Sequence, residues 1–295
     1  PKGWSTPNRQ NNLTNYTLEP SETDNMKRYE VQPAAVTDMG NGTYLIDMGK
    51  EIVGSLKLDV NGNKETLILE YGEELKEDGS VKYQLNTGNK YQEKWTLKAG
   101  EQSVSGIGMK TFRYVMIRGC KSALSADRVR GLQLRQPFDD EASYFRSANG
   151  VLNDVYELSK YTSKVTNQDV YVDTQNRERR AYEGDALIAA MTSYSYSEAS
   201  TLAGYSAKYL LTHTAWPAEY SLYNIMLVYQ NYMYTGDKRE LESNYQKLKE
   251  KTLEQYYDAN IGLMEDVTDS DVSGQKIMVD WPTTERDGYK MTEAY

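Results

Sequence analysis

The spacing of apolar residues changes once along this chain, and that change most constrains the fold. Between about residues 42 and 136, apolar and polar residues form short runs with the period of β-strands. After Pro137-Phe-Asp-Asp-Glu141, apolar residues recur every three to four positions, as on one face of an amphipathic helix. The chain of 295 residues is long enough for about two domains, so a strand-rich part followed by a helix-rich part is expected.

The strand-rich part consists of short runs separated by glycine-containing turns. Ser55 to Val60 alternates strictly between polar and apolar residues, and the following Asn61-Gly62-Asn63 is a strong turn signal. Further runs of this kind lie at residues 44–48, 66–71, 94–97, 112–117 and 129–134. Several short strands joined by tight turns predict an antiparallel β-sandwich of the jelly-roll type.

The helix-rich part carries apolar faces of two kinds. Asp185 is placed to cap a helix over residues 186–199, with Ile188 among its buried residues. Residues 219–234 are apolar nearly all round, which predicts an inner helix, whereas residues 238–257 predict an amphipathic outer helix. Inner and outer helices in alternation predict layered helical hairpins. Another apolar face is expected to carry Val151, Leu152, Val155, Leu158 and Tyr161.

We therefore divide the chain into three segments. Residues 1–35 are polar and predict an extended lead-in, residues 36–137 a β-sandwich domain, and residues 138–295 a helical domain. The chain stops shortly after the dense motif at residues 279–289. We expect from this that it is a fragment of a longer protein.

The composition excludes several classes of function. The net charge of −9 argues against nucleic-acid and anionic-membrane partners, and no apolar run approaches the roughly 20 residues of a membrane span. Cys120 and His213 are the only residues of their types, which excludes an internal disulfide and a Cys/His zinc site. A structural role is expected for His213. Enzymatic chemistry would then depend on carboxylates, tyrosines or arginines.

Residues 173–185 gather four carboxylates and three arginines into one short segment. Such a cluster is often only a solvated, mixed-charge surface. It also suits glycoside hydrolysis, which needs two carboxyl groups and further groups that hold the sugar ring. If Asp173, Glu178 and Asp185 converge, their repulsion raises the pKa of one of them, and Tyr182 can line the pocket.

The pattern Asp173-x4-Glu178-Arg179-x2-Tyr182-x-Gly184-Asp185 resembles the signature of the bacterial α-L-rhamnosidase family. A single motif of this kind is weakly specific. Other segments of the chain also resemble family motifs, and together they occur in the family's order. They lie at residues 47–54, 70–75, 112–115, 234–237 and 279–281.

The resemblance implies a β-sandwich followed by an (α/α)6 barrel, of which this chain would carry the first half. It implies inverting hydrolysis of terminal α-L-rhamnosides, with Glu178 as the general acid. The general base has no counterpart here and is expected on a later barrel loop, beyond Tyr295. The family's substrate-binding residues fall on Asp173, Tyr182, Asp185, Asp280 and Trp281.

Tyr182 replaces a family tryptophan, which bears on the identity of the sugar more than on the reaction. Two alternatives stay open: a non-catalytic carbohydrate-binding homologue, and a glycosidase for a related deoxy or uronic sugar. No cofactor is required, and the expected partner is a rhamnoside. A structural calcium ion is a weaker alternative, because its candidate ligands lack EF-hand spacing: Asp266, Asp269 and Asp271. The sequence leaves open the oligomeric state and the choice among periplasmic, secreted and cytoplasmic locations.

Overall fold

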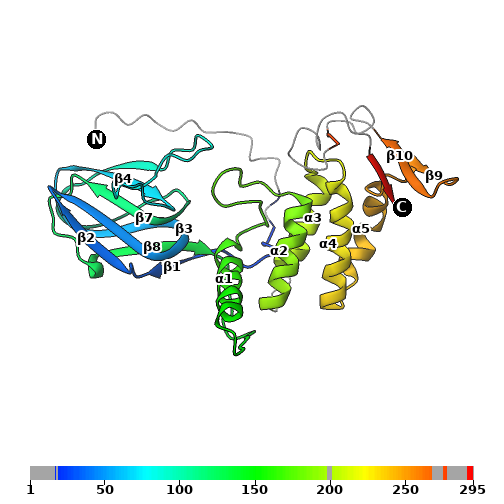
Figure 1. Ribbon diagram of the computed structural model, residues 1–295, viewed down its shortest axis with the longest axis horizontal. Coiled ribbons are helices and arrows are strands. Elements are labelled where there is room, and N and C mark those ends of the chain that lie inside the picture. Colours follow the sequence, from blue (N-terminus) through cyan, green and yellow to red (C-terminus); the bar gives the residue numbers. More distant parts are fainter. Residues whose placement is uncertain (1–16, 18, 198–200, 268–274, 278–290, 295) are drawn as a thin grey trace.

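The computed structural model describes residues 17, 19–197, 201–267, 275–277 and 291–294. An antiparallel β-domain is followed by a helical part, as the change of period predicts (Figure 1). The strands of the β-domain are β1 (Lys27–Val31), β2 (Ala35–Gly40), β3 (Thr43–Asn63), β4 (Thr66–Gly72), β5 (Gln92–Thr96), β6 (Ala99–Ser105), β7 (Lys110–Arg118) and β8 (Val129–Arg135).

The long strand β3 organises the β-domain. The strand order is β1-β8-β3-β7-β4-β5, and β2 and β6 also pair with β3. The first part of β3 pairs with β2 and β7, and its last part pairs with β6 and β8. The register shifts between Asp47 and Ile52, where Gly49 takes a φ of 77°. This irregularity bends β3 between the part that pairs with β2 and the part that pairs with β6 and β8.

The strict alternation in the second half of β3 has the predicted effect. Leu56, Leu58 and Val60 are fully buried in the core, and the intervening Lys57 and Asp59 lie on the other face. Other residues of β3 and of its neighbouring strands complete this core, among them Ile46, Leu67, Leu69, Phe112 and Ile117.

The turn predicted at Asn61-Gly62-Asn63 is wrong by about two residues. β3 continues to Asn63, and Gly62 pairs with Gly100 of β6. A Cβ at Gly62 would lie 2.2 Å from the carbonyl oxygen of Lys98, so glycine serves close packing of two chains there. The chain turns at Lys64, whose φ is 57°.

Three strands had no clear signal in the sequence. β1 lies inside the predicted lead-in and pairs with β8, so this part of the lead-in belongs to the sheet. β2 and β6 are also polar and mostly exposed. Their pairing with β3 decides their structure, because they bury few apolar side chains of their own.

The helical part packs as neighbouring hairpins, with α1 (Gly150–Thr166) between the β-domain and α2 (Glu183–Tyr196) (Figure 1). Its core gathers small and aliphatic residues, including Ala186, Ala190, Leu202, Leu210 and Leu227. A small sheet of β9 (Tyr257–Asp258), β10 (Leu263–Val267) and β11 (Met291–Ala294) follows the helices. The helices are α1 (Gly150–Thr166), α2 (Glu183–Tyr196), α3 (Thr201–Thr212), α4 (Tyr220–Thr235) and α5 (Arg239–Glu250).

The start of α2 differs from the prediction in a way that matters for the site. Asp185 is not the N-cap, because α2 begins at Glu183 and Tyr182 occupies the cap position. The extended backbone of Tyr182 and its carbonyl, which accepts from Ala186 N–H, start the helix three residues earlier. The Asp185 carboxylate therefore lies in the first turn.

Other helix predictions also need correction. Ile188 is 70 % exposed rather than buried, and α5 ends at Glu250 rather than near residue 257. Leu253 follows in the left-handed conformation, which stops the helix.

Helix α4 is not enclosed on all sides. Its packed face includes Asn224 and Asn231, whose side chains bond to Ala207 and Tyr194. The buried face of α4 therefore combines these hydrogen bonds with the apolar contacts of Leu227 and Val228. The apolar faces of α1 and α4 leave several large side chains exposed, including Val151, Leu152, Val155, Leu158, Tyr223, Met226, Tyr229, Met233 and Tyr234.

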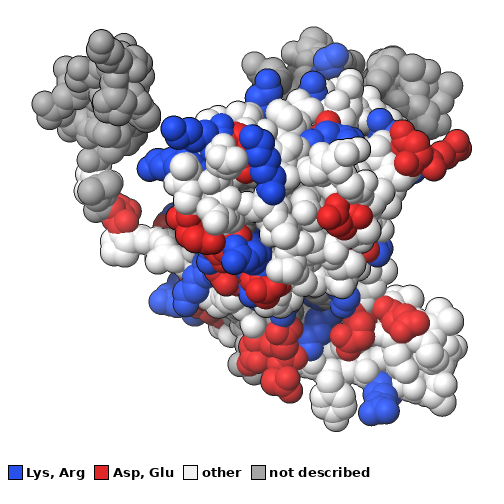
Figure 2. Space-filling model, turned by 90° about the vertical axis from the view of Figure 1, so that its left-hand side faces the viewer, with Lys and Arg blue, Asp and Glu red and all other residues white. Residues whose placement is uncertain are grey.

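Charged side chains of both signs are interspersed on the face shown in Figure 2. In this view, basic side chains do not form a continuous surface, in keeping with the negative net charge. In the described part of the chain, no helix combines the length and the hydrophobicity needed to cross a membrane.

Candidate active site

The segment 173–180 forms a closed loop just before α2. The backbone N–H of Asp173 donates to the Arg180 carbonyl over 3.0 Å, and the N–H of Arg180 donates to Asp173 Oδ1 over 3.1 Å. Arg179 takes a φ of 53°, in the left-handed region. The two ends of the loop are thereby held together, and Glu178 is presented between them.

Three predicted carboxylates converge on one cavity at this loop. Asp173, Glu178 and Asp185 line a space of about 140 Å³, and Tyr182 lines the same space. Asp185 reaches it because it stands in the first turn of α2. The sequence left open whether these three carboxylates converge, and the structure shows that they line the same cavity. The remaining lining residues are Arg177, Trp216, Pro217 and Tyr220.

Glu178 is held by two neighbours. The Tyr182 hydroxyl donates to Glu178 Oε2 over 2.5 Å, and the Arg177 guanidinium donates to Oε1. Burial, followed by the hydrogen bond and charge of Glu178, raises the pKa of Tyr182 to about 12. Tyr182 therefore stays protonated near neutral pH and donates to Glu178.

Asp185 is the carboxyl group whose pKa rises through this convergence. Burial raises the pKa of Asp185 first, and the negative charges of Asp173 and Glu178 raise it further. The sequence predicted that repulsion would raise one pKa among the three. The structure assigns that rise to Asp185.

A fourth carboxylate, Glu183, supports the cavity from behind. Its side chain is fully buried, and its two oxygens accept from the Ala215 N–H over 3.2 and 3.3 Å. Burial raises the pKa of Glu183, and the positive charges of Lys251 and Arg180 partly oppose this. Glu183 thus connects the start of α2 to the segment that carries Trp216.

The β-domain holds the outer side of the loop. The Tyr91 hydroxyl donates to the Asn176 carbonyl over 2.5 Å, and the Asn176 amide donates to Glu73. Arg179 donates to the Met109 carbonyl over 2.6 Å and to the Gln175 carbonyl over 2.9 Å. The loop that carries Glu178 is therefore fixed by both parts of the fold.

Some predicted residues lie outside this description. Asp280 and Trp281 fall outside the described residues, as do the side chains of the calcium candidates Asp266, Asp269 and Asp271. Their predicted roles stay predictions. Among the side chains that the structure does describe, no group of three or more His, Cys, Asp or Glu is arranged to hold a metal ion.

His213 lies away from the cavity lining. Its ring stacks on Tyr209 at a centroid distance of 3.9 Å, and its Nδ1 lies 3.0 Å from the Tyr209 carbonyl oxygen. These contacts link His213 to the end of α3.

The sequence prediction missed Arg177, Trp216 and Tyr220 as cavity residues. Arg177 precedes Glu178 directly, but in the sequence it is only one of the three arginines of the charge cluster at residues 173–185. Trp216 carries a weak signal, an aromatic residue followed by proline in the turn between two helices. No local pattern shows that this turn faces residues 173–185, because the packing of α2 against α4 brings them together.

Comparison with known proteins places this chain in a family. Residues 140–295, more than half of the chain, match the family model described as the bacterial alpha-L-rhamnosidase 6 hairpin glycosidase domain. The chain belongs to the bacterial α-L-rhamnosidase family. Residues 37–135 match the family's concanavalin-like domain. The resemblance drawn from the ordered motifs is confirmed.

Similar proteins share the architecture. A curated alpha-L-rhamnosidase of Streptomyces avermitilis is 29% identical over 170 residues, which cover 55% of this chain and 16% of that protein. The GH78 family rhamnosidase of Bacillus sp. GL1 has a TM-score of 0.69 at 18% identity, covering 85% of this chain and 28% of that one.

The crystal structure of a Streptomyces avermitilis alpha-L-rhamnosidase complexed with L-rhamnose has a TM-score of 0.68 at 22% identity. That likeness covers 81% of this chain and 25% of the other. The chain thus spans between 16% and 28% of the length of these relatives. At these identities the structural likeness establishes the fold.

Proposed function

We propose that the protein is an inverting glycoside hydrolase that releases terminal α-L-rhamnose from glycosides or polysaccharides. The observation that carries the proposal is the cavity shared by Asp173, Glu178, Asp185 and Tyr182, in a chain of this family. Two carboxylates and an aromatic wall next to a proton donor suit the binding and cleavage of a sugar.

Glu178 is the general acid in this proposal. Its carboxyl group donates a proton to the glycosidic oxygen as the bond to the sugar breaks. Asp173 and Asp185 accept hydrogen bonds from the sugar hydroxyls, and Tyr182 positions Glu178 through its hydroxyl. Inversion needs a second carboxylate about 6.5–9.5 Å from the acid to activate water. We assign that base to none of the described residues.

The test is the Glu178→Gln substitution in the full-length natural protein. We expect kcat/KM for a rhamnoside with a poor leaving group to fall about 10²- to 10⁴-fold, because the amide has no proton to give. A nitrophenyl rhamnoside should lose less, since its leaving group needs little protonation. Glu250→Gln at the exposed end of α5 is the matched control. Near-normal hydrolysis of the poor substrate by Glu178→Gln refutes the assignment.

Tyr182 supports one alternative, a glycosidase for a related deoxy or uronic sugar. A tyrosine replaces the tryptophan of the family pattern, and its hydroxyl is committed to Glu178. Hydrolysis rates on a panel of nitrophenyl glycosides distinguish the two proposals. Faster hydrolysis of another deoxy or uronic glycoside than of the rhamnoside favours the alternative. Binding of rhamnose without any hydrolysis instead favours a non-catalytic carbohydrate-binding homologue.

A further inference from the structure

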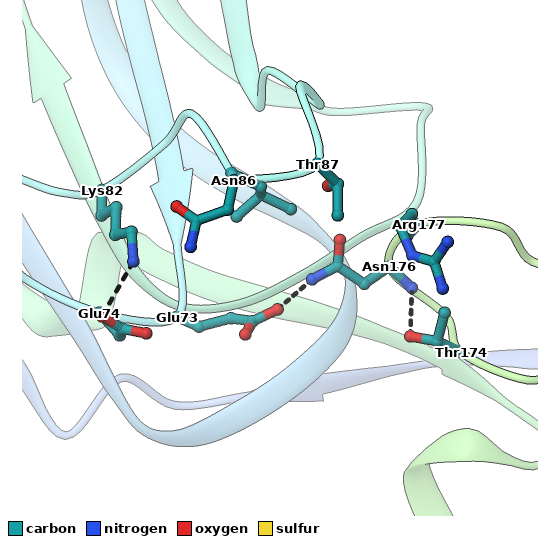
Figure 3. A pocket seen from close by; sticks show the side chains of 9 residues that line it. Glu73, Glu74, Lys82, Asn86, Thr87, Thr174, Asn176 and Arg177 are labelled. Atoms are coloured by element: carbon teal, nitrogen blue, oxygen red, sulfur yellow. Dashed lines mark hydrogen bonds and ion pairs between the residues drawn. The ribbon is translucent and has the colours of Figure 1, made fainter. Parts of the chain in front are cut away.

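A second cavity adjoins the candidate active site and shares Arg177 with it. It has a volume of about 410 Å³ and lies between the connection of β4 to β5 and the 173–180 loop (Figure 3). We call it the leaving-group groove. One wall comes from the β-domain and consists of Glu73, Glu74, Lys82, Leu85, Asn86 and Thr87. The other wall comes from Thr174, Asn176 and Arg177.

The groove lies where the chemistry proposed for Glu178 requires the leaving group to be. A general acid protonates the oxygen of the bond that breaks, so the released sugar lies on one side of it and the leaving group on the other. Asp173, Tyr182 and Asp185 define the side of the released sugar. The leaving-group groove begins at Arg177, the neighbour of Glu178, and contains none of those three residues.

The walls of the groove are polar. Lys82, Asn86 and Arg177 supply donors, Glu73 and Glu74 supply acceptors, and Leu85 is the only apolar residue of the lining. Figure 3 shows side chains from both walls directed at the same space. A flat aromatic group packs best on apolar walls, whereas a sugar offers hydroxyls to both the donors and the acceptors. Some of these groups also bond to each other, as Lys82 does to Glu74 over 3.4 Å.

The groove is also preformed. The Lys82 N–H donates to the Glu74 carbonyl over 3.0 Å, and the Leu85 N–H donates to the Asn89 carbonyl over 2.9 Å. The Asn176 amide closes one end on Glu73. The side-chain amide of Asn86 is exposed and makes no hydrogen bond within the described part of the chain, so it is available to a ligand. A fixed loop reduces the entropy lost on binding.

A larger groove nearby is a weaker candidate. Its volume is about 770 Å³, but its lining contains neither Arg177 nor Glu178. It runs along α1 and includes apolar side chains such as Leu158 and Val165. The polar groove is the one that shares a residue, Arg177, with the cavity of the candidate acid.

We propose that the leaving-group groove binds the part of the substrate that departs, and that this part is a hydroxylated sugar of a glycan rather than a flat aromatic aglycone. This inference rests on the proposed function, because it takes Glu178 to be the acid.

The experiment compares two substrates in the full-length natural protein: a rhamnosyl disaccharide and nitrophenyl α-L-rhamnoside. The test variant combines Lys82→Ala with Asn86→Ala. We expect the ratio of kcat/KM for the disaccharide over that for the nitrophenyl substrate to fall about tenfold, since only the sugar uses both side chains. The matched control combines Asn63→Ala with Lys121→Ala. These residues line another polar groove of the β-domain that shares no residue with either cavity.

A binding measurement keeps the inference testable without turnover. In the Glu178→Gln background, the disaccharide should bind more tightly than free L-rhamnose. The test variant should weaken only the binding of the disaccharide, with the Tm unchanged. Equal losses for both ligands, no loss for either, or a larger loss for the aromatic substrate would overturn the inference. If the wild-type protein hydrolyses no rhamnoside, the proposed function fails as well, whereas rhamnoside hydrolysis with an unchanged ratio overturns the groove alone.

Discussion

At the scale of single residues, the convergence of carboxylates raises the pKa of Asp185. Its pKa is raised by burial and then by Asp173 and Glu178. The sequence could name these three residues because each has a counterpart in the family pattern. It could not say which one would have the raised pKa, since that depends on burial in the folded protein.

Asp185→Asn should stabilise the protein at neutral pH while lowering its activity. A raised pKa in the folded state means that Asp185 adds stability only when protonated, and this contribution is lost as pH rises through the folded pKa. The neutral asparagine avoids that loss, so its Tm should exceed that of the wild type at pH 7. The difference should vanish below the ordinary Asp pKa of about 3.9, where Asp185 is protonated in both states.

Thermal unfolding at several pH values checks this prediction. A gain of 1 kcal/mol would appear as roughly 2–4 °C in a protein of this size. Asp169→Asn, at an exposed position, is the control and should show no such pH-dependent gain. A Tm advantage that persists unchanged at pH 3 would contradict the burial-and-repulsion account of Asp185.

At the scale of elements, the loop of residues 173–180 depends on its anchors. Arg179 bonds to backbone carbonyls at Gln175 and Met109 and takes a left-handed conformation. The sequence marks this loop through its charges. It does not reveal that Arg179 points towards the β-domain, because its contact with Met109 spans 70 positions of the chain.

Arg179→Ala should lower kcat about 10- to 100-fold with a smaller change in KM. The loop would lose the guanidinium bonds that fix it, and small displacements of a catalytic group are costly. Steady-state kinetics on a rhamnoside, together with the Tm, measure the effect. Arg146→Ala, at an exposed position, should match the wild type. A change in KM alone would show that Arg179 binds substrate instead of positioning the loop.

At the scale of the whole molecule, the β-domain and the helical part build the site together. Tyr91 of the β-domain donates to Asn176, and its hydroxyl lies 3.4 Å from the Arg179 guanidinium, which donates to it. Tyr161 of α1 donates to the Glu51 carbonyl over 2.7 Å. The β-domain is therefore more than a neighbour of the helical part, because its contacts reach the loop of Glu178.

Tyr91→Phe and Arg179→Ala should be non-additive in a double-mutant cycle. Both residues hold the same loop and contact each other, so the second substitution should cost less than it does in the wild type. We expect a coupling free energy of about 0.5–3 kcal/mol, calculated from the kcat/KM values of the four proteins in the cycle. Costs that add to within about 0.3–0.5 kcal/mol would mean two independent anchors.

The sequence by itself determined that a helical part follows a β-domain, and it determined the family. It also singled out four residues that line the cavity: Asp173, Glu178, Tyr182 and Asp185. These follow from local period and from ordered motifs, which do not need the fold. Tertiary structure alone decided that Gly62 continues a strand and that Trp216 lines the cavity. It also decided that the β-domain supplies one wall of the leaving-group groove. Each of these depends on contacts between segments far apart in the chain, where no local pattern carries the information.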